Sequence, residues 1–198
     1  DVLNEGLFPS AIGNSTQLRI SDFDDSNVRD VDLVSASITQ NPTPVSDVFQ
    51  TGSGPVGYLL FTTHIAPAEA ALVAAIEDFE TAGVTDLILD LRYNGGGFLD
   101  IANQLSYMIA GPSAASGRVF DETQFNDKYP TINPVTGQAL TPTAFHEVTQ
   151  GFSLPAGNPL PSINLNRVYI LSSADTCSAS EAIINGLRGI NVEVILIG

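Results

Sequence analysis

The sequence predicts an α/β fold, because short apolar segments of strand length alternate with segments whose apolar residues follow a helical period. The strand-like segments are 56–62, 85–91, 167–172 and 192–197. With 198 residues and 43% apolar composition, the chain is long enough to bury a sizeable core. We therefore expect one main domain built from repeated β-α units.

The predicted helices lie between these strands, at 67–81, 98–110 and 179–188. Pro67 suits the first turn of the first helix, since its missing N–H group would have no partner there, and Gly83 suits the position just after it. From 111 to 166 the helical and strand periods disappear, and Pro, Gly, Asn and Thr dominate. A loop of this length is usually functional or partly disordered, with a short strand at Gly117–Phe120 as the alternative.

Residues 1–45 form a separate N-terminal segment, rich in Asp, Asn and Ser and β-rich in its apolar patches. Gln17–Ile20 and Val28–Val34 are predicted as short strands. The best candidate boundary is the linker Thr39–Ser46, which holds two prolines. The core is therefore assigned to residues 46–198.

Composition excludes several classes of partner. The net charge of −15 makes nucleic acid and anionic membrane surfaces poor partners, because their phosphates would repel the chain. There is no apolar run of about 18 residues and no signal-peptide pattern. Cys177 is the single cysteine, so it has no intrachain disulfide partner. No Cys/His spacing suits a metal, and no metal or organic cofactor is implied.

The first motif is Thr176-Cys177-Ser178-Ala179-Ser180-Glu181, at the junction between the predicted strand 167–172 and the helix after it. A serine at a helix start lies near unpaired N–H groups and the positive end of the helix dipole, which stabilise an oxyanion. Serine is also a favoured N-cap, and on local chemistry alone capping is the simpler interpretation.

The second motif is Asp90-Leu91-Arg92-Tyr93-Asn94-Gly95-Gly96-Gly97, directly after the strand at 85–91. Three glycines let the backbone approach a ligand closely, as oxyanion holes and phosphate loops require. The spacing fits neither a dinucleotide site nor a P-loop, so nucleotide binding is disfavoured. Taken alone, the motif is equally consistent with a tight strand-to-helix turn.

Together the two motifs resemble peptidase family S41, the C-terminal processing or tail-specific serine proteases, over most of the chain. The resemblance implies a ClpP/crotonase-like spiral, a nucleophile at Ser178, and oxyanion donors from the N–H of Ala179 and of Gly95 or Gly96. Glu181 matches a glutamate that matters for activity in the family, and Arg92 and Asn94 are expected to brace the glycine turn. Residues 1–45 resemble the closing strands of a PDZ domain or a linker.

The family's general base is a lysine, which acts when desolvation keeps its amine neutral. The only lysine here is Lys128, in a polar stretch without a motif, and we interpret it as a solvated surface residue. By resemblance the base follows in a G-x-x-T-x-G-K pattern that begins at Gly198, so the core is truncated before it and this fragment is expected to be inactive alone. Position 189, where many relatives have an acidic residue, is Gly, which favours a Ser-Lys dyad over a triad.

Other bases and nucleophiles are weaker candidates. His64 ends the strand at 56–62 and His146 lies in the long loop, but neither sits in a recognisable motif. The ordinary interpretation of Cys177 is a small buried thiol, and a role as nucleophile is a minor alternative.

By resemblance, the substrates are exported or unfolded polypeptides engaged near their C-termini by strand addition, and the location is the bacterial periplasm or cell envelope, or outside the cell. We expect the segment 111–166 to lie over the active site and shape a substrate channel. One alternative is a non-catalytic module that binds peptides or ligands on the same fold, because fold alone does not separate these functions. Another is a crotonase-type acyl-CoA enzyme, which would not need Ser178.

Overall fold

The computed structural model describes residues 6–24 and 26–198 and divides the chain into two units, with the division between Gln40 and Asn41. Residues 1–5 of the N-terminal segment, and residue 25, lie outside the described residues. The predicted boundary, Thr39–Ser46, spans this division. The two units are described separately below.

The smaller unit holds a two-stranded antiparallel sheet of β1 (Ser15–Ile20) and β2 (Arg29–Val34). Both strands overlap the apolar patches from which they were predicted, and this prediction is confirmed. Leu18 lies opposite Val31, and an exposed ion pair joins Arg19 to the neighbouring Asp30 at 2.7 Å. The resemblance of this segment to the end of a PDZ domain stays a prediction.

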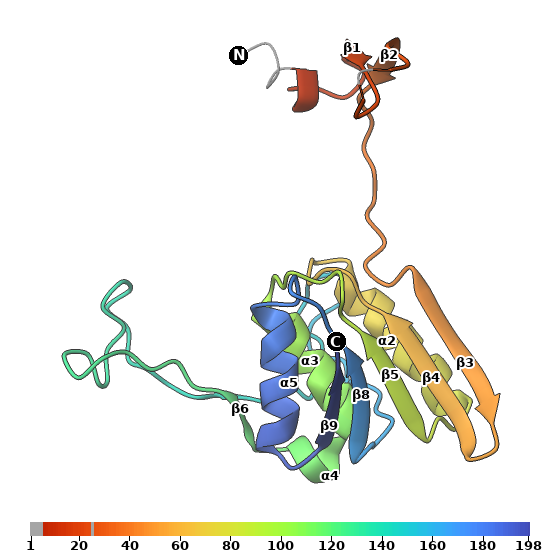
Figure 1. The fold of residues 1–198 in the computed structure, drawn as a ribbon. Coiled ribbons are helices and arrows are strands. Elements are labelled where there is room, and N and C mark those ends of the chain that lie inside the picture. The colour runs from red at the N-terminus through yellow and green to blue at the C-terminus, as the bar shows by residue number, and fades with distance from the viewer. Residues whose placement is uncertain (1–5, 25) are drawn as a thin grey trace. The chain divides into compact units, whose positions relative to one another are not determined.

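The larger unit is built on a five-stranded sheet in the spatial order β3-β4-β5-β8-β9 (Figure 1). The strands are β3 (Val45–Thr51), β4 (Gly54–Leu60), β5 (Asp86–Asp90), β8 (Arg167–Leu171) and β9 (Glu193–Ile197). β4, β5, β8 and β9 run parallel, and β3 pairs with β4 in the antiparallel direction. The predicted α/β class, with a mostly parallel sheet, is confirmed. The finer assignment to a ClpP/crotonase spiral stays a prediction.

Strand β3 was not predicted, since the sequence interpretation placed its first two residues in a linker. It is an edge strand whose side chains are mostly exposed, so it lacks the apolar run that marks a buried strand. A hairpin signal was nonetheless present, because Gly52 and Ser53 separate two segments rich in β-branched and aromatic residues.

Three helices connect the parallel strands: α2 (Ala68–Thr81), α3 (Leu99–Ala110) and α5 (Ala179–Gly189). Each lies within one residue of its predicted bounds at either end. Pro67 immediately precedes α2, and Gly83 follows it with a φ of 65°, a left-handed conformation that glycine adopts without strain. A short helix, α4 (Pro112–Ala115), follows α3.

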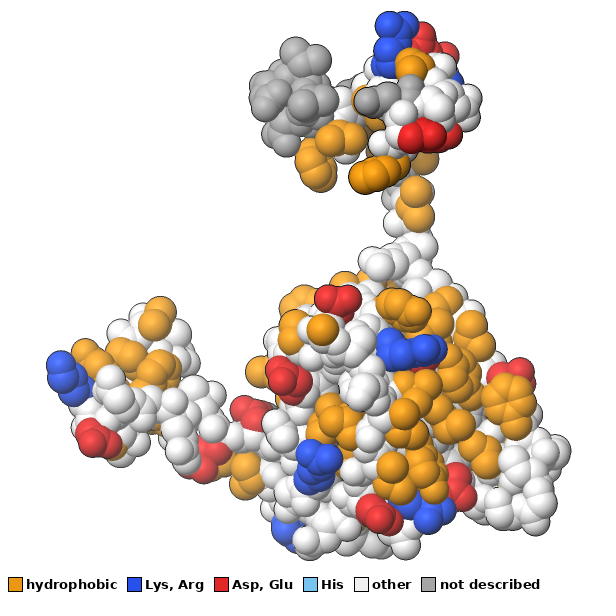
Figure 2. Space-filling model, in the orientation of Figure 1, with side chains coloured by type: hydrophobic (Ala, Val, Ile, Leu, Met, Phe, Trp, Pro, Cys, Tyr) orange, Lys and Arg blue, Asp and Glu red, His pale blue; other side chains and the backbone are white. Residues whose placement is uncertain are grey.

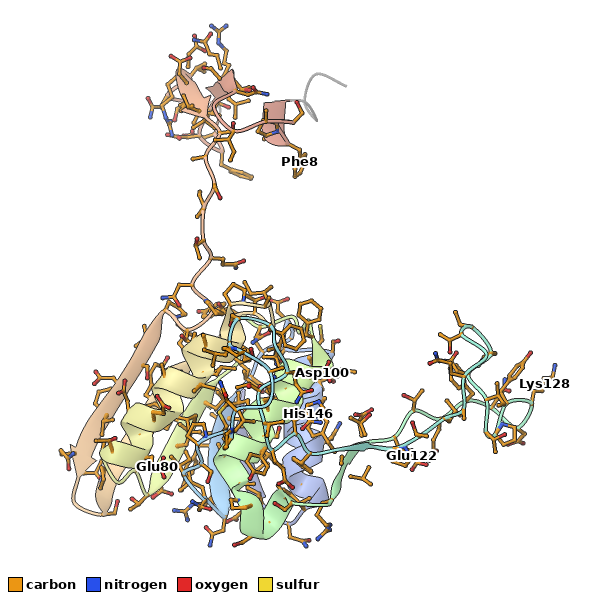
Figure 3. All side chains as sticks on the ribbon, turned by 180° about the vertical axis from the view of Figure 1, so that it is seen from behind. Phe8, Glu80, Asp100, Glu122, Lys128 and His146 are labelled. Atoms are coloured by element: carbon orange, nitrogen blue, oxygen red, sulfur yellow. The ribbon has the colours of Figure 1, made fainter. Side chains whose placement is uncertain are left out.

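The core lies between one face of the sheet and helices α2, α3 and α5 (Figures 1 and 3). Side chains of β4, β5 and β8 alternate between this buried face and the opposite one, as the strand period requires. The largest fully buried side chains include Leu59, Phe61, Leu72, Ile76, Phe79, Leu87, Leu89, Ile101, Leu105 and Met108.

The opposite face of the sheet carries apolar side chains that are only partly buried, visible as a patch in Figure 2. A shallow groove of about 370 Å³ crosses it. Its apolar lining includes Val56, Ile88, Tyr169, Leu171 and Ile197. The sheet is therefore covered by helices on one side.

The long segment between α4 and β8 has two parts. Residues 122–142, between β6 (Val119–Asp121) and β7 (Thr143–Ala144), project away from the sheet and helices as an arm (Figure 1). This arm does not lie over the edge that carries the two motifs, so the expectation that the whole segment covers the site is not met there. Residues 149–154 instead return to the core at the start of α2.

Buried Glu69 of α2 holds this returning loop. Its Oε1 accepts the backbone N–H groups of Gln150 at 2.7 Å and Gly151 at 3.2 Å, and its Oε2 accepts those of Ser153 and Leu154 at 2.9 Å each. Burial raises the pKa of this carboxyl, but the backbone donors, chiefly Ser153, Leu154 and Gln150, outweigh burial, and the pKa lies below its ordinary value.

Candidate active site

The carboxyl ends of parallel strands β4, β5 and β8 lie along one edge of the sheet. β4 leads to His64, β5 leads to residues 91–97, here called the glycine turn, and β8 leads to residues 172–178, the serine loop. Binding sites of open parallel sheets form at this edge, because the loops after neighbouring strands converge there. The fold therefore brings together the two motifs found in the sequence.

The middle glycine of the glycine turn lies directly against Ser178. A Cβ atom at Gly96 would come within 2.8 Å of Ser178 Cβ, 2.9 Å of the Cys177 carbonyl oxygen and 3.0 Å of Ala179 N. Gly96 also has a φ of 100°, which side chains rarely adopt. Only glycine fits this position without displacing backbone.

Side chains around the proposed nucleophile donate hydrogen bonds to carbonyl groups of the glycine turn. The four donor and acceptor pairs are Thr176 Oγ1 to Leu91 O (2.7 Å), Ser173 Oγ to Arg92 O, Ser180 Oγ to Asn94 O (2.9 Å) and Cys177 Sγ to Gly95 O (3.1 Å). These bonds explain why hydroxyl and thiol residues follow one another in this part of the sequence. The sequence alone did not reveal these partners. The bonds hold the two loops together as one unit.

Ser178 is exposed and sits at the N-cap of α5 with φ 58° and ψ −120°. A positive φ is uncommon for a residue with a side chain and costs on the order of 1–3 kcal/mol; such residues cluster at functional sites. The Ser178 N–H donates to Glu181 Oε2 at 2.9 Å, so Glu181 helps to hold this conformation. The strained serine thus stands at the positive end of a helix.

Two of the backbone N–H groups proposed as oxyanion donors, those of Gly95 and Ala179, have no acceptor within residues 6–24 and 26–198. Gly95 is exposed, whereas Ala179 is fully buried beneath Gly96. The Gly96 N–H, by contrast, donates to Asn94 Oδ1 at 3.0 Å. Of the two glycines proposed as donors, Gly95 therefore has the available N–H group.

The family model of peptidase family S41 matches residues 55–198, which cover the whole sheet from β4 onward and both motifs. This chain belongs to peptidase family S41. No curated protein sequence matches the chain.

Solved structures agree with the family. A Bacteroides fragilis protein described as an S41 protease is 26% identical to this S41 chain, with a TM-score of 0.66 over 94% of the chain and 48% of that protein. The photosystem II D1 C-terminal processing protease is 18% identical, with a TM-score of 0.51 over 94% and 44%, and shows the shared fold. The S41 chain thus spans about half the length of these proteins.

The start of the glycine turn is braced by a buried carboxylate. Asp90, the last residue of β5, binds the Arg92 guanidinium at 2.7 Å and accepts the Tyr58 hydroxyl at 2.8 Å. Burial raises the pKa of Asp90, but the bonds from Arg92 and Tyr58 outweigh burial and hold the pKa below its usual value. Arg92 therefore acts on the turn through Asp90.

His64 lies behind the glycine turn with no exposed surface, and its Nδ1 is 3.0 Å from Asn94 Oδ1. Burial lowers its pKa to about 4, although the bonds with Asn94 and Gly96 oppose this shift. Its ring makes no hydrogen bond to Ser178 in this S41 chain. The structure therefore gives no support to His64 as the base that activates the serine.

The other basic candidates lie elsewhere. His146 contacts Asp100 of α3, with 2.9 Å between Nε2 and Oδ1, and the two side chains face each other in Figure 3. Lys128, the single lysine, lies on the projecting arm (Figure 3). Neither residue belongs to the edge that carries Ser178.

In the part of the chain that the structure describes, no three His, Cys, Asp or Glu side chains gather as a metal site would require. Among the same residues, every helix is too short or too polar to cross a bilayer.

Proposed function

We propose that this S41 chain carries the nucleophile and oxyanion donors of a serine peptidase. The observation that supports this most directly is the contact of Gly96 with Ser178 and Ala179, which joins a glycine turn to a strained serine at a helix start. Membership of a peptidase family supports the same conclusion.

In the proposed reaction, Ser178 Oγ bonds to the carbonyl carbon of the scissile peptide while its proton passes to a general base. The carbonyl oxygen becomes an oxyanion that accepts the N–H groups of Gly95 and Ala179. Gly95 is exposed, so its N–H is the more accessible of the two donors, whereas Ala179 is buried beside Gly96. The leaving amine takes the proton, and water then hydrolyses the acyl-enzyme.

We propose a lysine beyond Gly198 as the base, by resemblance to the family. Within the described residues, Lys128 lies on the arm and His64 is bonded to Asn94, so neither fits the role. The 198-residue chain alone is therefore expected to be inactive, whereas the full-length gene product is expected to cleave peptides.

The proposed substrates are exported or unfolded polypeptides cut near their C-termini, in the periplasm, the cell envelope or outside the cell. The name of the similar D1 C-terminal processing protease motivates the C-terminal preference. The sheet ends in β3 and β9, whose outer backbone groups offer an edge to which an extended peptide can add.

The test is cleavage of an unfolded polypeptide with an apolar C-terminus by the full-length gene product. A Ser178→Ala variant is expected to lose activity by ~10³-fold or more, as removal of a nucleophile does in serine proteases. The matched control is Ser162→Ala, outside both motifs, which is expected to retain activity. If the wild-type protein binds the polypeptide without cutting it, the non-catalytic binding module replaces the peptidase. Cleavage that survives in Ser178→Ala contradicts the assigned nucleophile.

A further inference from the structure

Asn94 is fully buried at the centre of the glycine turn, and the polar atoms of its side chain are all engaged. Its Oδ1 accepts the Gly96 N–H at 3.0 Å and meets His64 Nδ1 at 3.0 Å, while its Nδ2 donates to Phe61 O at 3.0 Å. Its backbone carbonyl accepts the hydroxyl of buried Ser180 at 2.9 Å. Asn94 therefore connects the loop after β4, the glycine turn and helix α5.

The bond from Ser180 sets the direction of the Gly95 N–H group. The peptide between Asn94 and Gly95 is trans, so its C=O and N–H point in opposite directions. Since the Asn94 C=O points to buried Ser180 on α5, the Gly95 N–H points away from that contact. Gly95 is exposed, so this N–H is the accessible one of the two proposed donors.

The next peptide unit is held as well. The Gly95 C=O accepts the Cys177 thiol at 3.1 Å, and the Gly96 N–H is held by Asn94 Oδ1. Both peptide planes beside Gly95 are therefore restrained by named partners. Rotation of either plane would break at least one of these bonds.

His64 contacts the Asn94 side chain and restrains its amide group. Because Asn94 Nδ2 donates to Phe61 O, the oxygen of the amide faces His64, and only a proton on His64 Nδ1 makes a hydrogen bond there. The Nε2 atom is buried without a partner, and the ring lies 4.4 Å from the Phe61 ring between centroids. The His64 backbone also donates to Gly96 O at 3.1 Å and accepts the Phe98 N–H at 2.9 Å.

We propose that Ser180 and His64 are positioning residues, which act through Asn94 to aim the Gly95 N–H at the oxyanion formed when Ser178 attacks. This assignment rests on the proposed peptidase function and extends it to two residues that touch no substrate. It also gives the buried, neutral imidazole of His64 a role other than that of a base.

The test separates oxyanion binding from substrate binding in the full-length gene product. A peptide aldehyde forms a hemiacetal with the nucleophile and needs the oxyanion donors, whereas the cleaved product peptide does not. We expect Ser180→Ala to weaken aldehyde inhibition and lower kcat by about 10- to 100-fold, less than removal of a whole donor, with KM and product affinity changed by less than about threefold. Ser106→Ala is the matched control, because Ser106 is also buried and bonds a backbone carbonyl, Ala102 O at 2.8 Å, within α3.

His64 supplies an independent pair of variants. His64→Asn keeps an N–H donor toward Asn94 and is expected to retain most of the aldehyde affinity, whereas His64→Leu removes the donor and is expected to lose it. If Ser180→Ala shows no folding transition in a thermal melt, the comparison of the two His64 variants tests the positioning role in its place. Equal losses of aldehyde and product affinity, or equal behaviour of His64→Asn and His64→Leu, overturn the positioning role. A wild-type protein that neither cleaves peptides nor binds the aldehyde overturns the proposed function and this assignment with it.

Discussion

Replacing Gly96 with Ala tests the contact on which the site depends. The added Cβ would lie 2.8 to 3.0 Å from three atoms, two of them backbone, and it would have to adopt a φ of 100°. Strain at such a φ costs on the order of 1–3 kcal/mol, and forcing a methyl group into a packed region costs roughly 1–3 kcal/mol more. We therefore expect Gly96→Ala to lower the free energy of unfolding by about 2–6 kcal/mol.

Gly95→Ala is the control. A Cβ there would meet only the Asp175 carbonyl oxygen, at 3.9 Å, and Gly95 is not among the glycines with positive φ. Its expected cost is below about 1 kcal/mol. In urea denaturation of the 198-residue chain, Gly96→Ala should move the unfolding midpoint down by roughly 1–2 M relative to Gly95→Ala. Equal midpoints for the two variants would refute the close packing of the glycine turn against Ser178.

Three further predictions concern the surroundings of the site. Ser178→Gly should be more stable than Ser178→Ala by about 1 kcal/mol, since glycine relieves the positive φ while both variants lack the hydroxyl; equal unfolding energies would show that Ser178 is unstrained. Glu69→Gln should cost about 2 kcal/mol at neutral pH. Because the pKa of Glu69 is lowered on folding, the stability it provides is present above its ordinary pKa and is lost as the pH falls through the lower folded value, so the difference from wild type should shrink in acid. Glu80→Gln, at an exposed position on the same helix, is the control for that series. Arg92→Gln should destabilise the chain at neutral pH, because buried Asp90 loses its guanidinium partner, and the loss should also fade in acid as Asp90 takes up a proton; a constant loss across pH would exclude this pairing.

Local sequence patterns were enough to predict the parallel strands and their helices. β5 and α2 carry their own signals. In β5 the signal is a short apolar run, and in α2 it is a 3.6-residue period with Pro67 and Gly83 at its ends. β3 was missed because it is an exposed edge strand, whose side chains do not have to be apolar. Its only clear signal was the turn at Gly52-Ser53.

The sequence also placed both motifs on loops that follow strands, where the structure has them. What it did not reveal are contacts between residues about 80 positions apart, such as Ser180 with the Asn94 carbonyl. The sequence showed only that His64 lies at the end of a strand. Its burial follows from the hydrogen bonds of its backbone with Gly96 and Phe98, and only the folded sheet brings these residues near. The direction of the 122–142 arm was equally outside the reach of local patterns.

The central claim, that Ser178 is the nucleophile, is tested most directly by covalent labelling of the full-length gene product with a fluorophosphonate, followed by trypsin digestion and mass spectrometry. Cleavage after Arg167 and Arg188 releases a peptide that contains both Cys177 and Ser178. We predict a single adduct on Ser178, absent in Ser178→Ala and present in the Cys177→Ala variant. An adduct on Cys177 or elsewhere, or none in a protein that cleaves peptides, would contradict the account.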